Sequence, residues 1–269
     1  MPELPEVETI VKELRPVLTG KTFRKIDILW QRSLVGGPER FEKELVDHSI
    51  EKVFRRGKYI CFLLDDGRHL TIHLRMTGKL LYTASEKEKK HLRVRFTLCE
   101  DCILHFIDMR KFGRIKLWPA GQPLLPDLGP EPLDSDNVSS VLTVTKSNRA
   151  IKTLLLDQHV LVGVGNIYAD EALFAAGIHP QTPAARVPKS KIKRLSRELP
   201  EILQAAIRNK GTTLSDYRPP ESSSGRNQLY LKVYGRENQP CPKCRTPIQR
   251  IKIDARSSHF CPTCQPVLA

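Results

Sequence analysis

The sequence lacks the long apolar runs, the repeats and the secretory start that mark several large classes of protein. None of its 269 residues lies in an apolar stretch of the roughly 18 residues that a membrane span requires. The acidic start does not have the basic and then apolar layout of a signal peptide, and no repeat is visible. We therefore expect a soluble, intracellular protein, whose 40% hydrophobic content can bury a core in one or two domains.

Acidic residues are scarce in the last third of the chain. From Ala185 to Ala269 there are 17 Lys plus Arg against 6 Asp plus Glu, which supplies +11 of the formal charge of +14. Clustered cations favour a polyanionic partner, because each phosphate that they neutralise releases condensed counterions. The charge favours nucleic acid as the partner, although many basic proteins are merely soluble.

The hydrophobic pattern changes period along the chain. Up to Trp118, short β-type runs are separated by turns, and Leu92–Leu98 alternates apolar and polar residues as a half-buried strand requires. These runs predict a sandwich or barrel of antiparallel sheet. Beyond the proline-rich segment Pro119–Pro132, apolar residues recur at helical spacing, and we place a domain boundary near residue 130. Pro200 predicts a kink or an early end of the last helix. The tail from Leu229 is interpreted as a strand followed by a cysteine-bearing hairpin.

Four of the seven cysteines have the spacing of a metal site. An odd number of cysteines argues against a disulfide framework. Two residues between thiolates let one tight turn aim both sulfurs at one ion, and two such turns complete a tetrahedron with Zn–S bonds of about 2.3 Å. The pattern C-x2-C-x16-C-x2-C predicts one structural zinc ion, because sulfur fills every position, with the ligands Cys241, Cys244, Cys261 and Cys264.

A second pair, Cys99 and Cys102, has no partner pair in the sequence. Two cysteines at the turn between two strands do not complete a tetrahedral site. We interpret them as two ordinary cysteines rather than as a second metal site.

Glycines interrupt the helical part at Val162–Tyr168, and Asn166 stands where the following helix begins. The segment fits an ordinary glycine turn with an asparagine cap. It also fits a phosphate seat, since the free amide groups of a helix N-terminus and an asparagine side chain can point at one oxygen. Both interpretations stay open on the residues alone.

The stretch "DMRKFGR" places Phe112 among cations, of which Arg110 is one. A lone phenylalanine there fits a surface residue of a half-buried strand. An apolar wedge beside arginines is also what a protein that opens a duplex uses to unstack a base step and fill the gap.

The first residues, "MPELPEVE", combine a helix start with two residues that a helix does not require. Pro5 at the first helical position and Glu6 in the first turn are typical of a helix N-terminus. Pro2 and Glu3 precede that helix. We expect Met1 to be removed, which exposes the secondary amine of Pro2, and such an amine at neutral pH has a neutral fraction about 300-fold larger than that of lysine.

A neutral secondary amine can attack a sugar carbon and form an iminium intermediate, which makes strand-breaking eliminations possible. Glu3 and Glu6 would be close enough to transfer protons. The residues thus allow covalent catalysis at the amino terminus alongside the plain helix start.

Together these motifs resemble the bacterial formamidopyrimidine-DNA glycosylase family from Pro2 to Gln265. They are "MPELPEVETI", "RRGKY", "HLRMTGKL", "DMRKFGR", "VGVGNIYADEALF", "VYGR" and "HFCPTCQ". The resemblance implies an α+β fold in three parts: an N-terminal catalytic helix and antiparallel β-sandwich (1–130), a helix–two-turn–helix DNA-binding domain (131–228) and a C-terminal zinc-ribbon hairpin (229–269).

The implied activity is base-excision DNA repair by a bifunctional enzyme. It would act as a DNA-formamidopyrimidine glycosylase, a hydrolase that removes 8-oxoguanine and formamidopyrimidines from duplex DNA. It would then act as a DNA-(apurinic or apyrimidinic site) lyase by β,δ-elimination. The resemblance further implies damaged or abasic double-stranded DNA as partner, no membrane, a monomer, and a cytoplasmic, nucleoid-associated bacterial location.

The motif match assigns catalytic roles to five residues. Pro2 resembles the Schiff-base nucleophile at C1′ and Glu3 the proton donor that opens the sugar ring, with Glu6 as a supporting carboxylate. Lys58 and Arg256 resemble residues that contact phosphates and donate protons during elimination.

Further matches concern DNA contacts. The residues matched to DNA-binding positions are His91, Arg110, Lys152 and Asn166. Those matched to side chains that enter the duplex after the damaged nucleotide flips out are Met76, Arg110 and Phe112.

The sequence departs from the family at two places. Before "HFC", where the family usually reads Ala-Gly-Arg-Gly, this chain has Asp254 and Ala255 before Arg256, which restricts the backbone and adds a charge that phosphates repel. Ser222–Ser224 stands where the family has a mobile loop over the extruded base.

Two alternatives to this function remain at the level of sequence. One is an enzyme resembling endonuclease VIII, which removes oxidised pyrimidines, although Leu4 stands where that branch typically has glycine. The other is a non-catalytic zinc-ribbon protein that binds nucleic acid.

Overall fold

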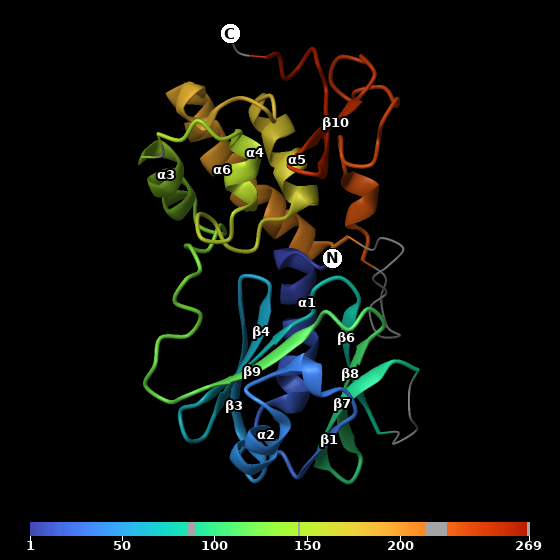
Figure 1. Cartoon of the computed structure of the whole chain (residues 1–269). Helices are drawn as coiled ribbons and strands as arrows, with labels where there is room; N and C mark the ends of the chain where they lie inside the picture. The colour runs from blue at the N-terminus through green and yellow to red at the C-terminus, as the bar shows by residue number, and fades with distance from the viewer. Residues whose placement is uncertain (85–89, 145, 213–224, 268–269) are drawn as a thin grey trace. The chain divides into compact units, whose positions relative to one another are not determined.

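The computed structural model describes residues 1–84, 90–144, 146–212 and 225–267 (Figure 1). Its contacts divide the chain into two compact units. The first unit contains Met1–Pro126 and, from a second segment, Thr212 and Gly225 among the described residues. The second unit contains Asp127–Gly211 and the residues from Arg226 onward. Within the described ranges, no helix combines the length and the apolar character needed to cross a membrane.

The first unit is a β-sandwich with a long helix (Figure 1). Its helices are α1 (Leu4–Leu18) and α2 (Pro38–Leu45). Its strands are β1 (Lys25–Ile28), β2 (Leu34–Val35), β3 (Ile50–Arg56), β4 (Tyr59–Leu64), β5 (His69–His73), β6 (Gly78–Thr83), β7 (Leu92–Cys99), β8 (Cys102–Asp108) and β9 (Arg114–Trp118). One sheet has the order β1-β7-β8-β6 and the other β2-β9-β5-β4-β3. Only the two-residue pairing of β2 with β9 is parallel among the pairs of these described strands, so the predicted antiparallel sandwich is confirmed.

Alternating burial explains how one sequence segment serves both a core and a surface. In β7 the apolar residues are buried and the intervening polar ones half-buried, as the sequence predicts for Leu92–Leu98. The inward residues of both sheets and the apolar stripe of α1 form one core, in which Phe23 meets Phe96 edge to face. Each large side chain fully buried there contributes roughly 1.5–3 kcal/mol.

Helix α1 begins one residue earlier than predicted. Leu4 is its first residue, so Pro5 occupies the second position rather than the first, and Glu3 is the N-cap. Pro5 is tolerated there because the first N–H groups of a helix have no partner within the helix. As the N-cap, Glu3 is held by the helix, since its carbonyl accepts the N–H of Val7 at 3.1 Å.

The turn between β7 and β8 corrects the interpretation of its two cysteines. Cys99 and Cys102 are paired across the antiparallel ladder with Cα atoms 4.7 Å apart and form a disulfide. That separation lies within the range that a disulfide bridges. They are therefore linked to each other rather than two ordinary free thiols.

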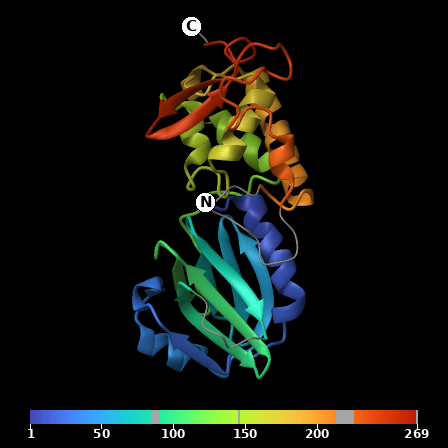
Figure 2. The same ribbon diagram turned by 90° about the vertical axis from the view of Figure 1, so that its right-hand side faces the viewer.

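The second unit is mostly helical and carries a small two-stranded ribbon. Its helices are α3 (Ser135–Val144), α4 (Ile151–Leu156), α5 (Asn166–Ala176) and α6 (Lys189–Arg208). The ribbon consists of β10 (Gln249–Ile253) and β11 (Arg256–Phe260), seen as red arrows beside the helices in Figure 2. Helix α6 packs against α3 and α5 around a core of its own.

The early end, one of the two outcomes predicted at Pro200, is wrong. Helix α6 continues through the buried Pro200, because packing on α3 and α5 outweighs the one hydrogen bond that proline removes. The other outcome, a kink, stays a prediction. The segment from Leu229 starts within a 3-10 turn, Asn227–Tyr230, and not in a strand. The cysteine-bearing hairpin that follows is confirmed.

Candidate active site and nucleic-acid interface

At the amino terminus of α1, each of two predicted catalytic carboxylates accepts a hydrogen bond from the backbone of the other residue. Glu3 and Glu6 form a capping box, in which the N–H of Glu3 donates to Glu6 Oε2 at 2.8 Å and the Glu3 side chain accepts from the backbone of Glu6. Glu6 Oε1 also accepts the N–H of Thr212 at 2.7 Å. Both carboxylates and Pro2 are buried. The structure thus brings together the three residues of the predicted covalent centre and fixes the orientation of Glu3.

Lys58 lies in the two-residue turn between β3 and β4. Gly57, the other residue of this turn, has a positive φ of 56°, which glycine adopts without strain. In the same turn Arg55 donates to Gly57 O at 3.1 Å and to Glu8 Oε2 at 2.9 Å, which ties the hairpin to α1. Lys58 itself is buried. The "RRGK" motif therefore presents a lysine from a braced turn rather than from a mobile loop.

A buried histidine that the sequence did not single out lies near Lys58. His73 Nδ1 accepts the N–H of Arg75 at 3.0 Å, and its ring meets Tyr59 edge-on at 4.6 Å. Burial lowers the pKa of His73 to about 3, and the charges of Arg75 and Lys58 act in the same direction. The imidazole is therefore neutral near pH 7 and carries its proton on Nε2, which makes it a hydrogen-bond donor. In the sequence, His73 is the first residue of the motif "HLRMTGKL", which is the feature that could have pointed to it.

The three residues predicted to enter a duplex lie on two loops of the first unit. Met76 follows β5, while Arg110 and Phe112 follow β8. Phe112 is 48% exposed and Met76 36%, so both side chains are accessible at the surface. The guanidinium carbon of Arg110 lies 4.9 Å from the centre of the Phe112 ring, a cation–π distance. His91 is half-buried at the start of β7.

The N-terminus of α5 is the predicted phosphate seat of the second unit. Asn166 is its first residue, and the preceding Gly163 has a φ of 87° that glycine adopts without strain. The side chain of Gln158 braces this loop, since it accepts the N–H of Gly163 at 2.9 Å and donates to Leu156 O and Val164 O. Sequence reasoning missed Gln158, which bears no motif of its own. Asn166 donates to Ser257 O at 2.9 Å, which links α5 to the hairpin β10–β11.

Lys152, which was matched to a DNA-binding position, lies in a buried ion pair. Its side chain is 1% exposed, and Nζ lies 2.6 Å from Asp170 Oδ1. The ammonium group also donates to Ser257 O and to Ser258 Oγ, each at 2.7 Å. Asp170 Oδ2 in turn accepts the N–H of His259 at 2.8 Å. These contacts indicate a structural role for Lys152, while its contact with DNA stays a prediction.

Arg256 begins β11 directly after a two-residue turn. Asp254 and Ala255 form that turn with φ angles of 47° and 62°, the left-handed pair that tight hairpins require. Asp254 Oδ2 accepts the hydroxyl of Thr153 on α4. The carboxylate that was expected to repel phosphate is thus engaged with the protein, and Arg256 is exposed. Ser222–Ser224, the second departure from the family, lie outside the described residues.

The four predicted metal ligands converge in the second unit. The sulfur atoms of Cys241, Cys244, Cys261 and Cys264 all lie within 4.8 Å of one another. Two of the distances are 3.9 and 3.4 Å, close to the separation of about 3.8 Å expected around a tetrahedral zinc. Backbone N–H groups point at two of the sulfurs at 3.4 Å. The residues fit one structural zinc ion with no position left for water.

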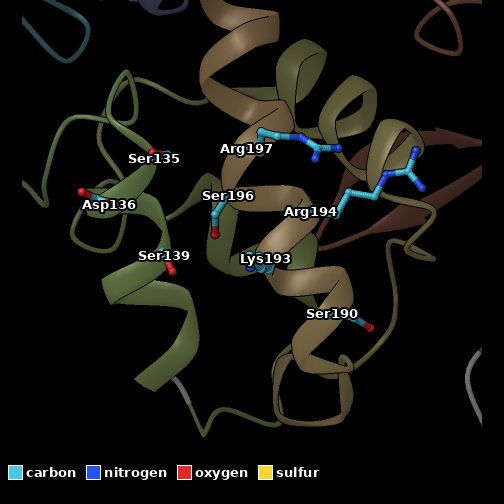
Figure 3. A pocket seen from close by; sticks show the side chains of 8 residues that line it. All are labelled: Ser135, Asp136, Ser139, Ser190, Lys193, Arg194, Ser196 and Arg197. Carbon is cyan, nitrogen blue, oxygen red and sulfur yellow. The ribbon is translucent and has the colours of Figure 1, made fainter.

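A groove of about 490 Å³ lies apart from all these residues, between α3 and α6 (Figure 3). Its lining side chains are polar or charged: Ser135, Asp136, Ser139, Ser190, Lys193, Arg194, Ser196 and Arg197. None of the predicted site residues lines it, so it has no part in the site described above.

Family models match most of the chain in three segments. Residues 1–115 match the formamidopyrimidine-DNA glycosylase N-terminal domain, and residues 128–218 match the H2TH domain of the same glycosylase. Residues 238–267 match a zinc finger found in FPG and IleRS.

Known proteins resemble the chain along its full length. The formamidopyrimidine-DNA glycosylase of Pelotomaculum thermopropionicum is 42% identical over 276 residues, which covers 99% of this chain and 100% of the relative. The Lactococcus lactis Fpg, solved with DNA containing an abasic site, superimposes with a TM-score of 0.90 at 36% identity, covering 98% of this chain and 99% of that one. A MutM complex with DNA containing carbocyclic 8-oxo-G gives 0.89 at 37% identity, covering 98% and 100%.

Proposed function

The chain belongs to the formamidopyrimidine-DNA glycosylase family, and from this premise we propose that it is a base-excision repair enzyme. It removes oxidised purines, 8-oxoguanine and formamidopyrimidines, from duplex DNA and then cleaves the strand at the abasic site. The relatives named for this activity and those solved with damaged DNA support the proposal. A DNA substrate also supports a cytoplasmic location at the nucleoid.

The proposed chemistry starts at the amine of Pro2, once Met1 has been removed. The amine attacks C1′ and gives up its proton, and the bond from C1′ to the base breaks, so that the base leaves with the electron pair and takes up a proton. Glu3 then protonates the ring oxygen, and the sugar opens to an iminium. Loss of a proton from C2′ then expels the 3′ phosphate, and a second elimination expels the 5′ phosphate. Water finally releases the sugar fragment from Pro2.

Other residues hold the DNA and assist these eliminations. Lys58 and Arg256 contact phosphates and supply protons, while Asn166 and His91 bind the backbone. The exposed Met76, Arg110 and Phe112 fill the gap that the extruded nucleotide leaves, which offsets part of the cost of unstacking. One structural zinc ion keeps the hairpin that carries Arg256 folded. The division into parts 1–130, 131–228 and 229–269 is proposed with these roles.

The observation that carries the proposal is the capping box at the start of α1. A capping box normally uses a short serine or threonine as the N-cap. Here the cap is Glu3, buried together with Glu6 beside Pro2. Burying two carboxylates at one helix end is costly unless they are hydrogen-bonded. The arrangement holds Glu3 rigidly next to the amine that would react, as acid–base catalysis needs.

Covalent trapping tests the proposal. The full-length zinc-loaded protein is mixed with duplex DNA containing 8-oxoguanine, a formamidopyrimidine, an oxidised pyrimidine or an abasic site, and borohydride is added. We expect a stable adduct with the purine lesions and the abasic site, and mass spectrometry should locate it on Pro2. Glu3→Gln should lower adduct formation on the lesion duplexes by at least about 100-fold. Glu39→Gln, on the exposed face of α2, is the matched control and should not change it.

Three results would overturn the proposal. An adduct formed equally well by protein with a blocked amino terminus would exclude Pro2. A preference for the oxidised pyrimidine would favour the endonuclease VIII-like activity. Salt-dependent binding of DNA without any cleavage, unaffected by Glu3→Gln, would leave a non-catalytic binding protein.

A further inference from the structure

Two loops of the first unit carry the residues proposed to enter the duplex, and the chain alone does not hold these loops together. The first loop joins β5 to β6 and bears Met76. The second joins β8 to β9 and bears Arg110 and Phe112. More than 30 residues separate the loops along the chain. The sheets place their ends side by side, since Gly78 is paired with Asp108 and His73 with Arg114. The conformation of the residues between these ends depends on contacts between the loops.

One buried carboxylate makes those contacts. Asp108, the last residue of β8, is 0% exposed. Its Oδ1 accepts the hydroxyl of Thr77 from the first loop and the N–H of Arg110 from the second at 3.2 Å. Its Oδ2 accepts the N–H of Gly113 at 2.7 Å, and the N–H of Arg110 also reaches Thr77 Oγ1 at 3.1 Å. Thr77 and the backbone on either side of Phe112 are thereby bound to one side chain.

The surroundings of Asp108 leave it little freedom. Its N–H donates to His91 O at 3.0 Å and its carbonyl accepts from Arg93 Nε at 2.8 Å, so β7 holds its backbone. A side chain at Gly113 would clash with the ring of Phe106, and its Cβ would lie 3.2 Å from Asp108 Oδ2, a tight contact. The second loop therefore packs closely against β8 at a position that favours glycine.

We propose that Asp108 is a positioning residue that makes the two loops enter DNA as one preformed wedge. This inference rests on the proposed function. Inserting side chains from two independent loops would require each loop to be ordered at the moment of entry, whereas a shared buried acceptor orders both in advance. The carboxylate of Asp108 is buried and accepts hydrogen bonds from N–H and O–H groups of the protein, so it does not itself meet the phosphates.

The test compares a step that needs the wedge with one that does not. Base removal from an 8-oxoguanine duplex under single-turnover conditions needs insertion, whereas cleavage of single-stranded DNA with a preformed abasic site uses the catalytic residues without insertion of the wedge. Asp108→Asn keeps the shape but places an NH₂ group against at least one donor. We expect about 10- to 100-fold slower base removal from the duplex and a change within about twofold on the single strand. Asp101→Asn, exposed in the turn at the other end of β8, is the control.

A double-mutant cycle with Phe112→Ala separates positioning from general damage to the fold. If Asp108 acts through the wedge, Asp108→Asn should slow the Phe112→Ala protein by less than about threefold, because the wedge is already lost. Thr77→Val, which removes a single hydroxyl and leaves the carboxylate, should give a smaller loss of the same kind and serves if Asp108→Asn does not fold.

Equal losses on both substrates, or full additivity with Phe112→Ala, would overturn the inference. If the unmodified protein cleaved neither the duplex nor the single strand, the proposed function would be refuted instead. Failure of the inference and failure of the proposed function therefore give different results.

Discussion

Replacing Lys152 with methionine should destabilise the second unit strongly, because it leaves the carboxylate of Asp170 buried without its cation. The two charged atoms lie 2.6 Å apart, and their side chains are 1% and 0% exposed. Removing one partner of such a pair typically costs about 3–5 kcal/mol. Since a domain is stable by only about 5–15 kcal/mol, we expect the loss of roughly a fifth of that stability at the least.

Urea unfolding of the zinc-saturated protein measures the loss, with hydrogen exchange in α4, α5 and β11 to assign it to the second unit. Lys193→Met on the exposed face of α6 is the matched control and should change stability by less than about 0.5 kcal/mol. Combining Lys152→Met with Asp170→Asn should restore part of the loss, because the uncompensated charge is then gone.

The reasoning fails if Lys152→Met costs less than about 1 kcal/mol or if the two substitutions add fully. If Lys152 instead contacted DNA, Lys152→Met would leave the stability unchanged. The slope of the logarithm of DNA affinity against the logarithm of salt concentration would then fall by about 1, the effect of losing one phosphate contact.

Two further predictions concern strain and protonation. Ala255→Gly should stabilise the hairpin by roughly 0.5–1 kcal/mol, since it relieves a left-handed alanine at φ 62°, and Ala255→Val should do the reverse; equal melting temperatures would show that the turn is not strained. The folded pKa of His73, about 3, is below its unfolded value near 6.5, so its contribution to stability is complete above pH 6.5 and is lost as pH falls toward 3. His73→Asn should flatten that loss in urea titrations between pH 7 and 4, and an unchanged pH dependence would contradict a buried neutral imidazole.

The sequence carried the fold where a local pattern determines the structure. Alternation along Leu92–Leu98 predicts β7, and the cysteine spacing predicts the zinc hairpin. The sequence pattern does not predict strand β6, Gly78–Thr83, because apolar and polar residues do not alternate regularly in "GKLLYT". The early end predicted as one outcome at Pro200 is wrong for a related reason, since tertiary packing and not local propensity decides whether α6 continues.

The candidate site was predictable where function depends on single motifs, and not where it depends on long-range partners. Pro2 and Glu3 stand at one chain end and can be read directly. Asp108 reaches Thr77 across 31 residues, and Lys152 reaches Ser258 across 106. No spacing rule announces such pairs, because they exist only once the fold brings distant segments together.

The carbonyl of Ser257 accepts hydrogen bonds from both Lys152 and Asn166, so α4, α5 and the zinc hairpin meet at one oxygen atom. Thermodynamic linkage makes this junction work in both directions. If Asn166 binds a phosphate as proposed, zinc that keeps the hairpin folded would strengthen that binding, and the bound phosphate would raise the affinity for zinc by the same factor. Chelators would then remove the metal more slowly from the DNA-bound protein.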